Sequence, residues 1–186
     1  MAFSDLRAGG IVVRPWGPGD EIAYRAIQDD ADVRRWSPVL HPKSADEVTA
    51  GLAREVEAGP GGGPGGFAVA DADSGRVLGD VSYRLDLPAP PFRIADVGYC
   101  VLPAARGRGV ASDALRLLTA WLLDPGGADL VRVQLDHAVE NVASCRTAAR
   151  AGFAGEGVRT GYLPLRADDG SPVVLHDTCL HGRIRA

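Results

Sequence analysis

Residues 105–112 read ARGRGVAS, with two arginines and two glycines placed directly before an apolar stretch. The preceding residues, 94–102, read IADVGYCVL and are rich in β-branched and aromatic side chains, which predicts a strand. From residue 110 to residue 123, apolar residues recur three and four positions apart, which predicts an amphipathic helix. The first turn of a helix leaves backbone N–H groups unpaired and carries the positive end of the helix dipole. The order strand, loop, helix therefore predicts that an anion binds at the start of this helix.

The composition is that of an ordinary globular chain. It has 186 residues, of which 46% are apolar and 24% charged, and this length predicts one domain with a sizeable core. Residues 1–10 are expected to form a short tail, and the run GPGGGPGG at 59–66 a flexible connector. The net charge of −4 disfavours nonspecific nucleic-acid binding and mildly favours a cationic substrate.

The N-terminus and the cysteines indicate where the chain works. No apolar run is long enough to span a bilayer and MAFSDLRAGG lacks the layout of a signal peptide, so we expect a cytoplasmic protein without membrane contact. Cys100, Cys145 and Cys179 are scattered with no CxxC pair, which predicts three free thiols and no metal site. The sequence leaves monomer and homodimer open.

The order of predicted elements is typical of a mixed α/β fold. Strands are expected at 11–16, 67–70, 77–85, 94–102, 130–135, 154–160 and 173–181, and helices from about 20, from 44, at 110–123 and at 141–151. Ser44 and Glu47 form a capping-box pattern, and Gly152 is expected to end the last helix in a left-handed conformation. Hairpins followed by a strand, helix, strand, helix, strand passage predict a single α/β (α+β) sheet without a second domain.

Three designs for phosphate binding compete with a plain basic loop for GRGVAS. A P-loop requires a lysine followed by serine or threonine, which is absent. A dinucleotide fingerprint requires a third glycine where Ser112 stands and an acid at a strand end, whereas Asp129 falls in a turn. The third design, Arg-x-x-Gly-x-Ala, is met by Arg106, Gly109 and Ala111. The alternative of a solvated basic loop remains, and the flanking strand and helix count against it.

The third design resembles the pyrophosphate loop of the GNAT family of acetyl-CoA-dependent N-acetyltransferases, Gln/Arg-x-x-Gly-x-Gly/Ala after the fourth strand. A second motif, NVASCRTAARAGF at 141–153, resembles the family's Asn-x-x-Ser segment ending in Gly-Phe, and it follows a strand at the expected distance. The similarity runs from about residue 11 to residue 181, and the Asn-x-x-Ser form looks like the branch typified by ribosomal-protein N-terminal acetyltransferases. It implies a single GNAT-type domain with a mixed, largely antiparallel central sheet of about seven strands flanked by about four helices.

The resemblance implies that acetyl-CoA lies along the strand and the loop. Backbone N–H groups from about Gly107 to Ser112 would form a nest for two phosphates, to which the loop arginines add charge-assisted contacts. Residues 99–101 are expected to offer backbone groups to the pantetheine arm, with their side chains in the core. Asn141 is expected to form a hydrogen bond with the arm, to cap its own helix, or to do both. The expected cofactor residues are Tyr99, Cys100, Val101, Arg106, Gly107, Arg108, Gly109, Val110, Ala111, Ser112, Asn141 and Ser144.

Transfer of an acetyl group from a thioester to an amine requires a base, a donor for the oxyanion and an acid for the departing thiolate. Asp96 stands where the resemblance puts an acidic residue, and it is the first candidate base, acting through water. The alternative is that Asp96 has a structural role or contacts the substrate. Asp136 and His137, at the end of the next strand, are further candidates. Many GNAT enzymes place a tyrosine as the acid seven residues after the asparagine, where this chain has Ala148. Ser144 is the substitute candidate, or else bonds back to its own helix.

The expected acceptor is a primary amine, either a protein N-terminus or a small molecule. It is expected to lie near the first two helices, the loops at 36–41 and 86–92, and Tyr162. The acids at 29, 30 and 32 attract a cation or simply form a solvated face. Two other functions compete: a non-catalytic acyl-CoA-binding GNAT-fold module, against which Asn141 and Ser144 speak, and a Rossmann-type nucleotide-binding protein.

Overall fold

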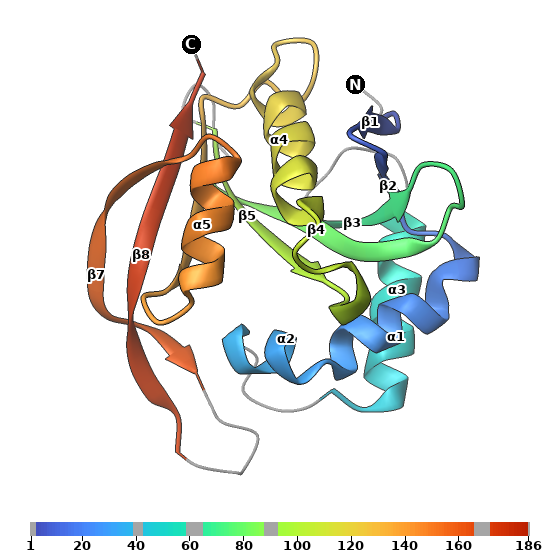
Figure 1. The fold of residues 1–186 in the computed structure, drawn as a ribbon, viewed down its shortest axis with the longest axis horizontal. Helices are drawn as coiled ribbons and strands as arrows, with labels where there is room; N and C mark the ends of the chain where they lie inside the picture. Colours follow the sequence, from blue (N-terminus) through green and yellow to red (C-terminus); the bar gives the residue numbers. More distant parts are fainter. Residues whose placement is uncertain (1–2, 39–42, 59–64, 88–92, 166–171, 186) are drawn as a thin grey trace.

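The computed structural model describes residues 3–38, 43–58, 65–87, 93–165 and 172–185 (Figure 1). Its strands are β1 (Leu6–Ala8), β2 (Ile11–Pro15), β3 (Gly65–Asp71), β4 (Val77–Leu87), β5 (Ile94–Val101), β6 (Arg132–Ala138), β7 (Ala154–Leu165) and β8 (Val174–Ile184). Its α-helices are α1 (Glu21–Asp29), α2 (Ala31–Trp36), α3 (Ala45–Ala58), α4 (Val110–Leu123) and α5 (Val142–Arg150).

All eight strands belong to one sheet, in the order β1-β2-β3-β4-β5-β6-β8-β7. Every neighbouring pair runs antiparallel except β5 and β6, which run parallel. The expected mixed, largely antiparallel sheet is confirmed, and the described residues add one strand and one helix to the approximate counts.

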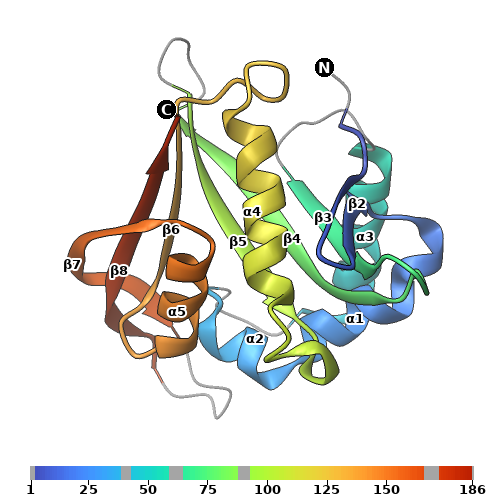
Figure 2. The same ribbon diagram turned by 45° about the horizontal axis from the view of Figure 1, so that its top comes forward.

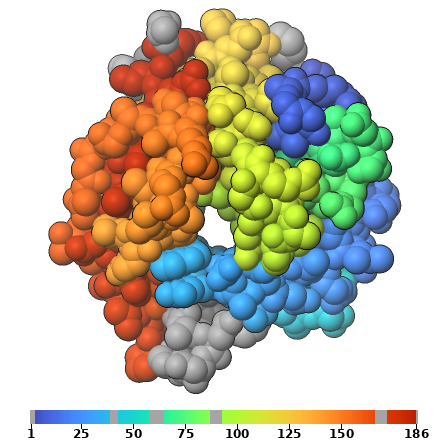
Figure 3. Space-filling view, viewed as in Figure 1, coloured from blue at the N-terminus to red at the C-terminus, as the bar shows by residue number. Residues whose placement is uncertain are grey.

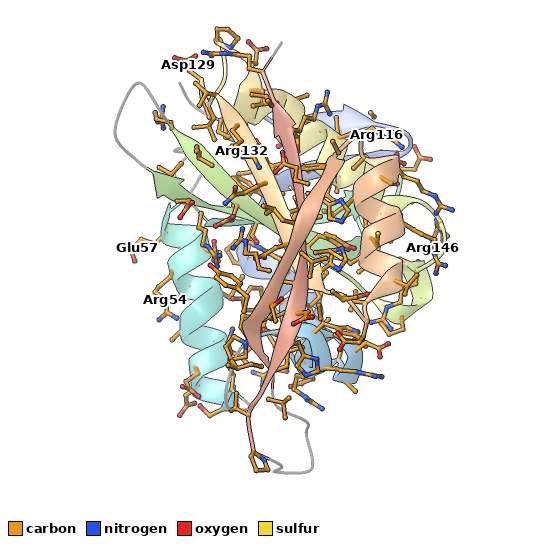
Figure 4. The ribbon with its side chains drawn as sticks, turned by 90° about the vertical axis from the view of Figure 1, so that its left-hand side faces the viewer. Arg54, Glu57, Arg116, Asp129, Arg132 and Arg146 are labelled. Carbon is orange, nitrogen blue, oxygen red and sulfur yellow. The ribbon has the colours of Figure 1, made fainter. Side chains whose placement is uncertain are left out.

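The helices cover both faces of the sheet. Figure 2 shows α4 lying across β4 and β5, and its Leu115, Leu118 and Leu122 are fully buried in the larger core. On the opposite face, Ile27 of α1 and Leu52 of α3 pack in a second core over β3 and β4. Figure 4 shows α3 and α5 on opposite sides of the sheet. Among the described residues, no helix is both long and apolar enough to cross a membrane.

The sheet opens between β5 and β6. These two strands pair only where Ile94–Asp96 meets Arg132–Gln134. Beyond that point β5 stays with β4 as far as Val101, while β6 stays with β8 as far as Ala138. Because each strand follows a different neighbour, the two diverge, and beyond Asp96 the edge of β5 that faces β6 pairs with no strand of the described residues.

Several sequence predictions are confirmed and others are corrected. The helix at 110–123 is confirmed, as is the capping box, in which Ser44 N–H donates to Glu47 at 2.8 Å and Glu47 N–H to Ser44 Oγ at 3.2 Å. The expected tail is wrong at Leu6–Ala8, which pair with β2, and Phe3 stacks on Phe67 with ring centroids 4.3 Å apart. The expected connector is wrong at residues 65–66, which begin β3, and its residues 59–64 lie outside the described residues.

Helix α2 was not expected from the sequence. It has six residues and is capped at its N-terminus by Asp30, whose carboxylate accepts a hydrogen bond from Val33 N–H at 3.0 Å. Six residues are too few for an isolated helix to be stable in water, so contacts with the rest of the chain must hold this one. Trp36, expected in a loop, is its last residue, and most of the expected loops at 36–41 and 86–92 lies outside the described residues.

Candidate functional site

A cavity of about 1120 Å³ occupies the gap between β5 and β6. It is lined by residues 96–101 of β5, residues 135–138 of β6, much of the loop at 105–112 and the start of α5. Figure 3 shows an opening through the molecule that is bordered by α2, by α5 and by the segment before α4. The divergence of the two strands thus gathers most of the residues that the sequence singled out around one space.

The loop before α4 carries a row of backbone N–H groups without partners among the described residues, and its residues from Gly107 to Ser112, except Arg108, line this space. Gly107 and Gly109 have φ angles of 75° and 85°, in the left-handed region that favours glycine. None of the six N–H groups from Gly107 to Ser112 donates a hydrogen bond to a described residue. The side chain of Ser112 is 4% exposed and donates to Gly109 O at 2.8 Å, so this residue offers the space only its backbone. Successive free N–H groups at a helix start form the nest expected for an anion.

The side chain of Arg106 does not reach into the nest. Its guanidinium contacts the carboxylate of Asp30 at 2.5 Å and that of Asp32 at 2.7 Å, and its Nε donates to Val101 O at 3.0 Å. These contacts fasten the start of α2 to the loop and explain how so short a helix is held. Arg108, in contrast, is exposed and forms neither a hydrogen bond nor a salt bridge with the described residues.

The first turn of α5 carries a hydrogen-bonded cluster on one wall of the cavity. Asn141 accepts a hydrogen bond from Ser144 N–H at 3.2 Å, so its expected role as N-cap is confirmed. Ser144 is 6% exposed, and its Oγ accepts a hydrogen bond from the Tyr99 hydroxyl at 3.0 Å. Gly152, with a φ of 86°, follows the end of the helix in the expected left-handed conformation. The sequence suggested only a core role for the Tyr99 side chain, and its polar contact was missed because it joins residues 45 positions apart.

The two candidate carboxylates face the same cavity. Asp96 bonds Arg84, whose Nε donates to its carboxylate at 3.2 Å, and Asp136 lies 3.7 Å from the guanidinium of Arg159. Burial raises the pKa of Asp136, and the negative charge of Asp96 raises it further. A carboxyl with a raised pKa accepts a proton more readily than an ordinary one, which suits a general base.

His137 is buried against a second histidine. Its Nδ1 donates to Ala138 O at 2.8 Å, and its Nε2 lies 3.2 Å from Nε2 of His181. Burial lowers the pKa of His181, and electrostatic repulsion from His137 lowers it further. Ligand atoms of these two histidines and of Cys145 lie within 4.8 Å of one another. Both ring nitrogens of His137 are therefore occupied by protein groups. Together Tyr99, His137, Asn141 and Ser144 form what we call the α5 wall.

The opposite wall of the cavity was not expected from the sequence. It is formed by Trp16, Tyr24, Glu55 and Asp80, which we call the α3 wall. Burial raises the pKa of Asp80 to about 6, although Cys100 donates hydrogen bonds to its carboxylate. Neither Asp80 nor Glu55 forms a salt bridge with a described residue. The only sequence signal for Asp80 was the polar alternation of residues 80, 82 and 84 along β4.

A scan of protein families matches residues 11–154 to the acetyltransferase (GNAT) domain model. The chain belongs to this family. The GNAT resemblance inferred from the two motifs is thus confirmed, and the matched range contains the loop, the start of α5 and all the residues that line the cavity except those at 162–164. No curated protein matches the chain.

Solved structures agree with the GNAT fold. A GNAT-family acetyltransferase from Bacillus anthracis superposes with a TM-score of 0.80 at 16% identity, over 98% of this chain and 99% of the other. The ribosomal-protein-S5-alanine acetyltransferase of Vibrio fischeri gives 0.79 at 21% identity, over 98% and 97%. Mycobacterium smegmatis RimJ, solved with CoA-disulfide, gives 0.79 at 20% identity, over 99% and 87%. At these identities the similarity shows the fold, which is a single GNAT domain. The substrate has to be inferred from the residues of the site.

Proposed function

We propose that this GNAT protein is an acetyl-CoA-dependent N-acetyltransferase that transfers acetyl to a primary amine by direct attack on the thioester. The row of free N–H groups from Gly107 to Ser112 carries the proposal, because it opens onto the same cavity as Ser144 and the two carboxylates. Pyrophosphate fits such a nest without any metal ligand. The unpaired edge of β5 at residues 97–101 is suited to bind a pantetheine arm in the manner of an added strand.

The residues of the cavity fit the steps of the transfer. Asp136, with Asp96 beside it, takes the proton of the attacking amine directly or through water. A free backbone N–H of β5 binds the oxygen that becomes negative when the amine attacks the thioester carbonyl. Ser144 lies in the first turn of α5, at the position proposed for the departing sulfur.

The acceptor in this proposal is a protein N-terminus or a small-molecule amine. An α-amino group with a pKa near 8 loses only about 1.4 kcal/mol to protonation at pH 7, whereas an alkyl amine near 10.4 loses about 4.6 kcal/mol. A single base of the Asp136 kind is therefore better matched to an α-amino group. We place the enzyme in the cytoplasm, where its three free cysteines stay reduced.

Thermal unfolding with acetyl-CoA, free CoA and NAD tests this proposal. A ligand at one hundred times its dissociation constant adds about 2.7 kcal/mol to the free energy of unfolding. We expect both CoA species to raise the melting temperature and NAD to leave it unchanged. An acceptor screen that detects released thiol, with peptide N-termini and small amines in separate arms, then measures the transfer. Stabilisation by CoA without thiol release from any acceptor would identify a non-catalytic acyl-CoA-binding module, and stabilisation by NAD alone would indicate a nucleotide-binding protein.

A further inference from the structure

The hydrogen bond between Tyr99 and Ser144 places a phenol directly behind a serine at the cavity. The hydroxyl of Tyr99, from β5, donates to Oγ of Ser144, from α5, at 3.0 Å. Both residues line the cavity. The phenol is the more acidic of the two hydroxyls and donates in this bond, so the serine's own hydroxyl proton has no acceptor among the described residues. The serine thus points a donor at whatever occupies the cavity.

The chemistry of the departing thiolate explains why such a pair is useful. A thiolate whose thiol has a pKa of about 8.5 needs only a weak acid to take up a proton. A serine hydroxyl is far weaker than that and, acting alone, would be left as an alkoxide. A phenol, with an ordinary pKa of about 10, is close to the thiol. The position one turn further along α5 provides no alternative, since Ala148 is fully buried and carries no acidic group.

We propose that Tyr99 is the terminal proton donor for the leaving thiolate and that Ser144 passes the proton on. This inference rests on the proposed acetyl transfer. As the carbon–sulfur bond breaks, its electron pair goes to sulfur, and sulfur takes the proton of Ser144 Oγ. In the same step Ser144 Oγ takes the proton of the Tyr99 hydroxyl, and the resulting phenolate is reprotonated by water in the cavity. The products are the amide and the free thiol of CoA.

A change of leaving group separates this role from a structural one. In single-turnover experiments, Tyr99→Phe is expected to slow acetyl transfer from acetyl-CoA by about 100-fold, the low end of what a positioned acid contributes. The selenium analogue of acetyl-CoA releases a selenolate, which is a much weaker base and departs without protonation. With this analogue the same variant is expected to lose less than about threefold. Equal losses with the two donors would overturn the proposal.

Two variants complete this experiment. Ser144→Ala breaks the same relay, so adding Tyr99→Phe to it is expected to cause little further loss with acetyl-CoA. Tyr162→Phe is the matched control, because it also removes a phenolic hydroxyl from the cavity but that hydroxyl is not bonded to Ser144. Its effect, whatever its size, is expected to be the same with both donors. Independent, additive losses from Tyr99→Phe and Ser144→Ala would contradict a relay.

A binding measurement tests the same contact without turnover. A hydroxyl that donates to sulfur stabilises the thiolate, so CoA bound to the wild-type protein is expected to ionise at a lower pH than CoA bound to Tyr99→Phe. The ultraviolet absorbance of the thiolate reports this titration. If the wild type transfers acetyl to no amine, the proposed function has failed, yet the titration still shows whether the pair faces the sulfur. Identical titrations in the two proteins overturn the role of Tyr99.

Discussion

The α5 wall and the α3 wall of the cavity satisfy their polar groups in opposite ways. On the α5 wall, side chains bond one another, as Tyr99 does with Ser144 at 3.0 Å and His137 with His181 at 3.2 Å. Behind this wall, Nδ1 of His181 is, like Trp16 Nε1, a buried atom without a hydrogen-bond partner among the described residues. On the α3 wall, Asp80 and Glu55 have no cationic partner among the described residues, and the buried Trp16 Nε1 has no hydrogen-bond partner there. Satisfied networks hold their groups in place, whereas a buried charge without a counter-charge costs stability. One wall is therefore organised before any ligand arrives, and the other carries uncompensated charge.

The largest effect is expected in the loop before α4, which is the proposed phosphate site beside the α5 wall. Gly109→Val puts a side chain where the backbone must approach the ligand, on a residue with a φ of 85°. We expect CoA to bind at least 100-fold more weakly, as measured by calorimetry. Gly75→Val is the matched control, because Gly75 has a φ of 71° and open space around it but lies in the turn between β3 and β4. If both variants lose stability but bind CoA normally, the loop is not the pyrophosphate site.

The second effect concerns the charge on the α3 wall. The pKa of Asp80 rises from 3.8 to about 6, so the folded state binds its proton more tightly than the unfolded state does. Protonated Asp80 therefore contributes to the free energy of unfolding below pH 4, and this contribution is lost as the pH rises through 6. Asp80→Asn removes that loss while keeping an oxygen for the bonds from Cys100. The shift sets a ceiling of about 3 kcal/mol, and because the amide must also be buried we expect a gain of about 1–2 kcal/mol at pH 7.5.

Urea unfolding at pH 7.5 and pH 4.5 measures this gain, which is expected to vanish at the lower pH. Asp20 provides a control of opposite sign, because its hydrogen bond with Arg14 holds its pKa below the ordinary value. Its contribution to stability is present above pH 4 and is lost on acidification, so Asp20→Asn is expected to destabilise the protein at pH 7.5. A destabilised Asp80→Asn at pH 7.5 would contradict the view that this wall carries uncompensated charge.

The two walls also differ in how far the sequence predicted them. The loop, α4 and α5 were predicted because their signals are local: glycines at positions that need positive φ, apolar spacing of three and four, and an asparagine cap. The α3 wall depends on contacts between distant segments, in which Trp16, Tyr24 and Glu55 meet a residue of β4. No local pattern encodes such a meeting. The carboxylate of Asp80 was therefore missed, whereas Asp96 and Asp136, which also line the cavity, were singled out as candidates through their positions beside the motifs.

The same distinction between local signals and distant contacts explains which contacts the sequence did not predict on the α5 wall and in the loop before α4. Tyr99 lies on the strand as expected, yet its hydroxyl contact depends on how β5 and α5 are placed in space. Arg106 was expected to reach phosphate, but its side chain bonds Asp30 and Asp32, 76 and 74 positions away in the chain. Backbone roles follow from sequence more reliably than side-chain partners do, because the backbone conformation is set by neighbours along the chain.

The smallest effect tests whether Arg106 can serve both α2 and the phosphate. Asp32 is 62% exposed at its side chain and shares this guanidinium with Asp30, so its ion pair is worth at most about 1 kcal/mol. If phosphate competes for the arginine, Asp32→Asn is expected to tighten CoA binding about two- to threefold at low salt, and the gain shrinks as salt screens the charges. Asp46→Asn, which removes an exposed charge at the start of α3, is the control for net charge. Equal affinities for the wild type and Asp32→Asn at low salt would mean that Arg106 stays with α2 when CoA binds, and that the phosphates are held without its side chain.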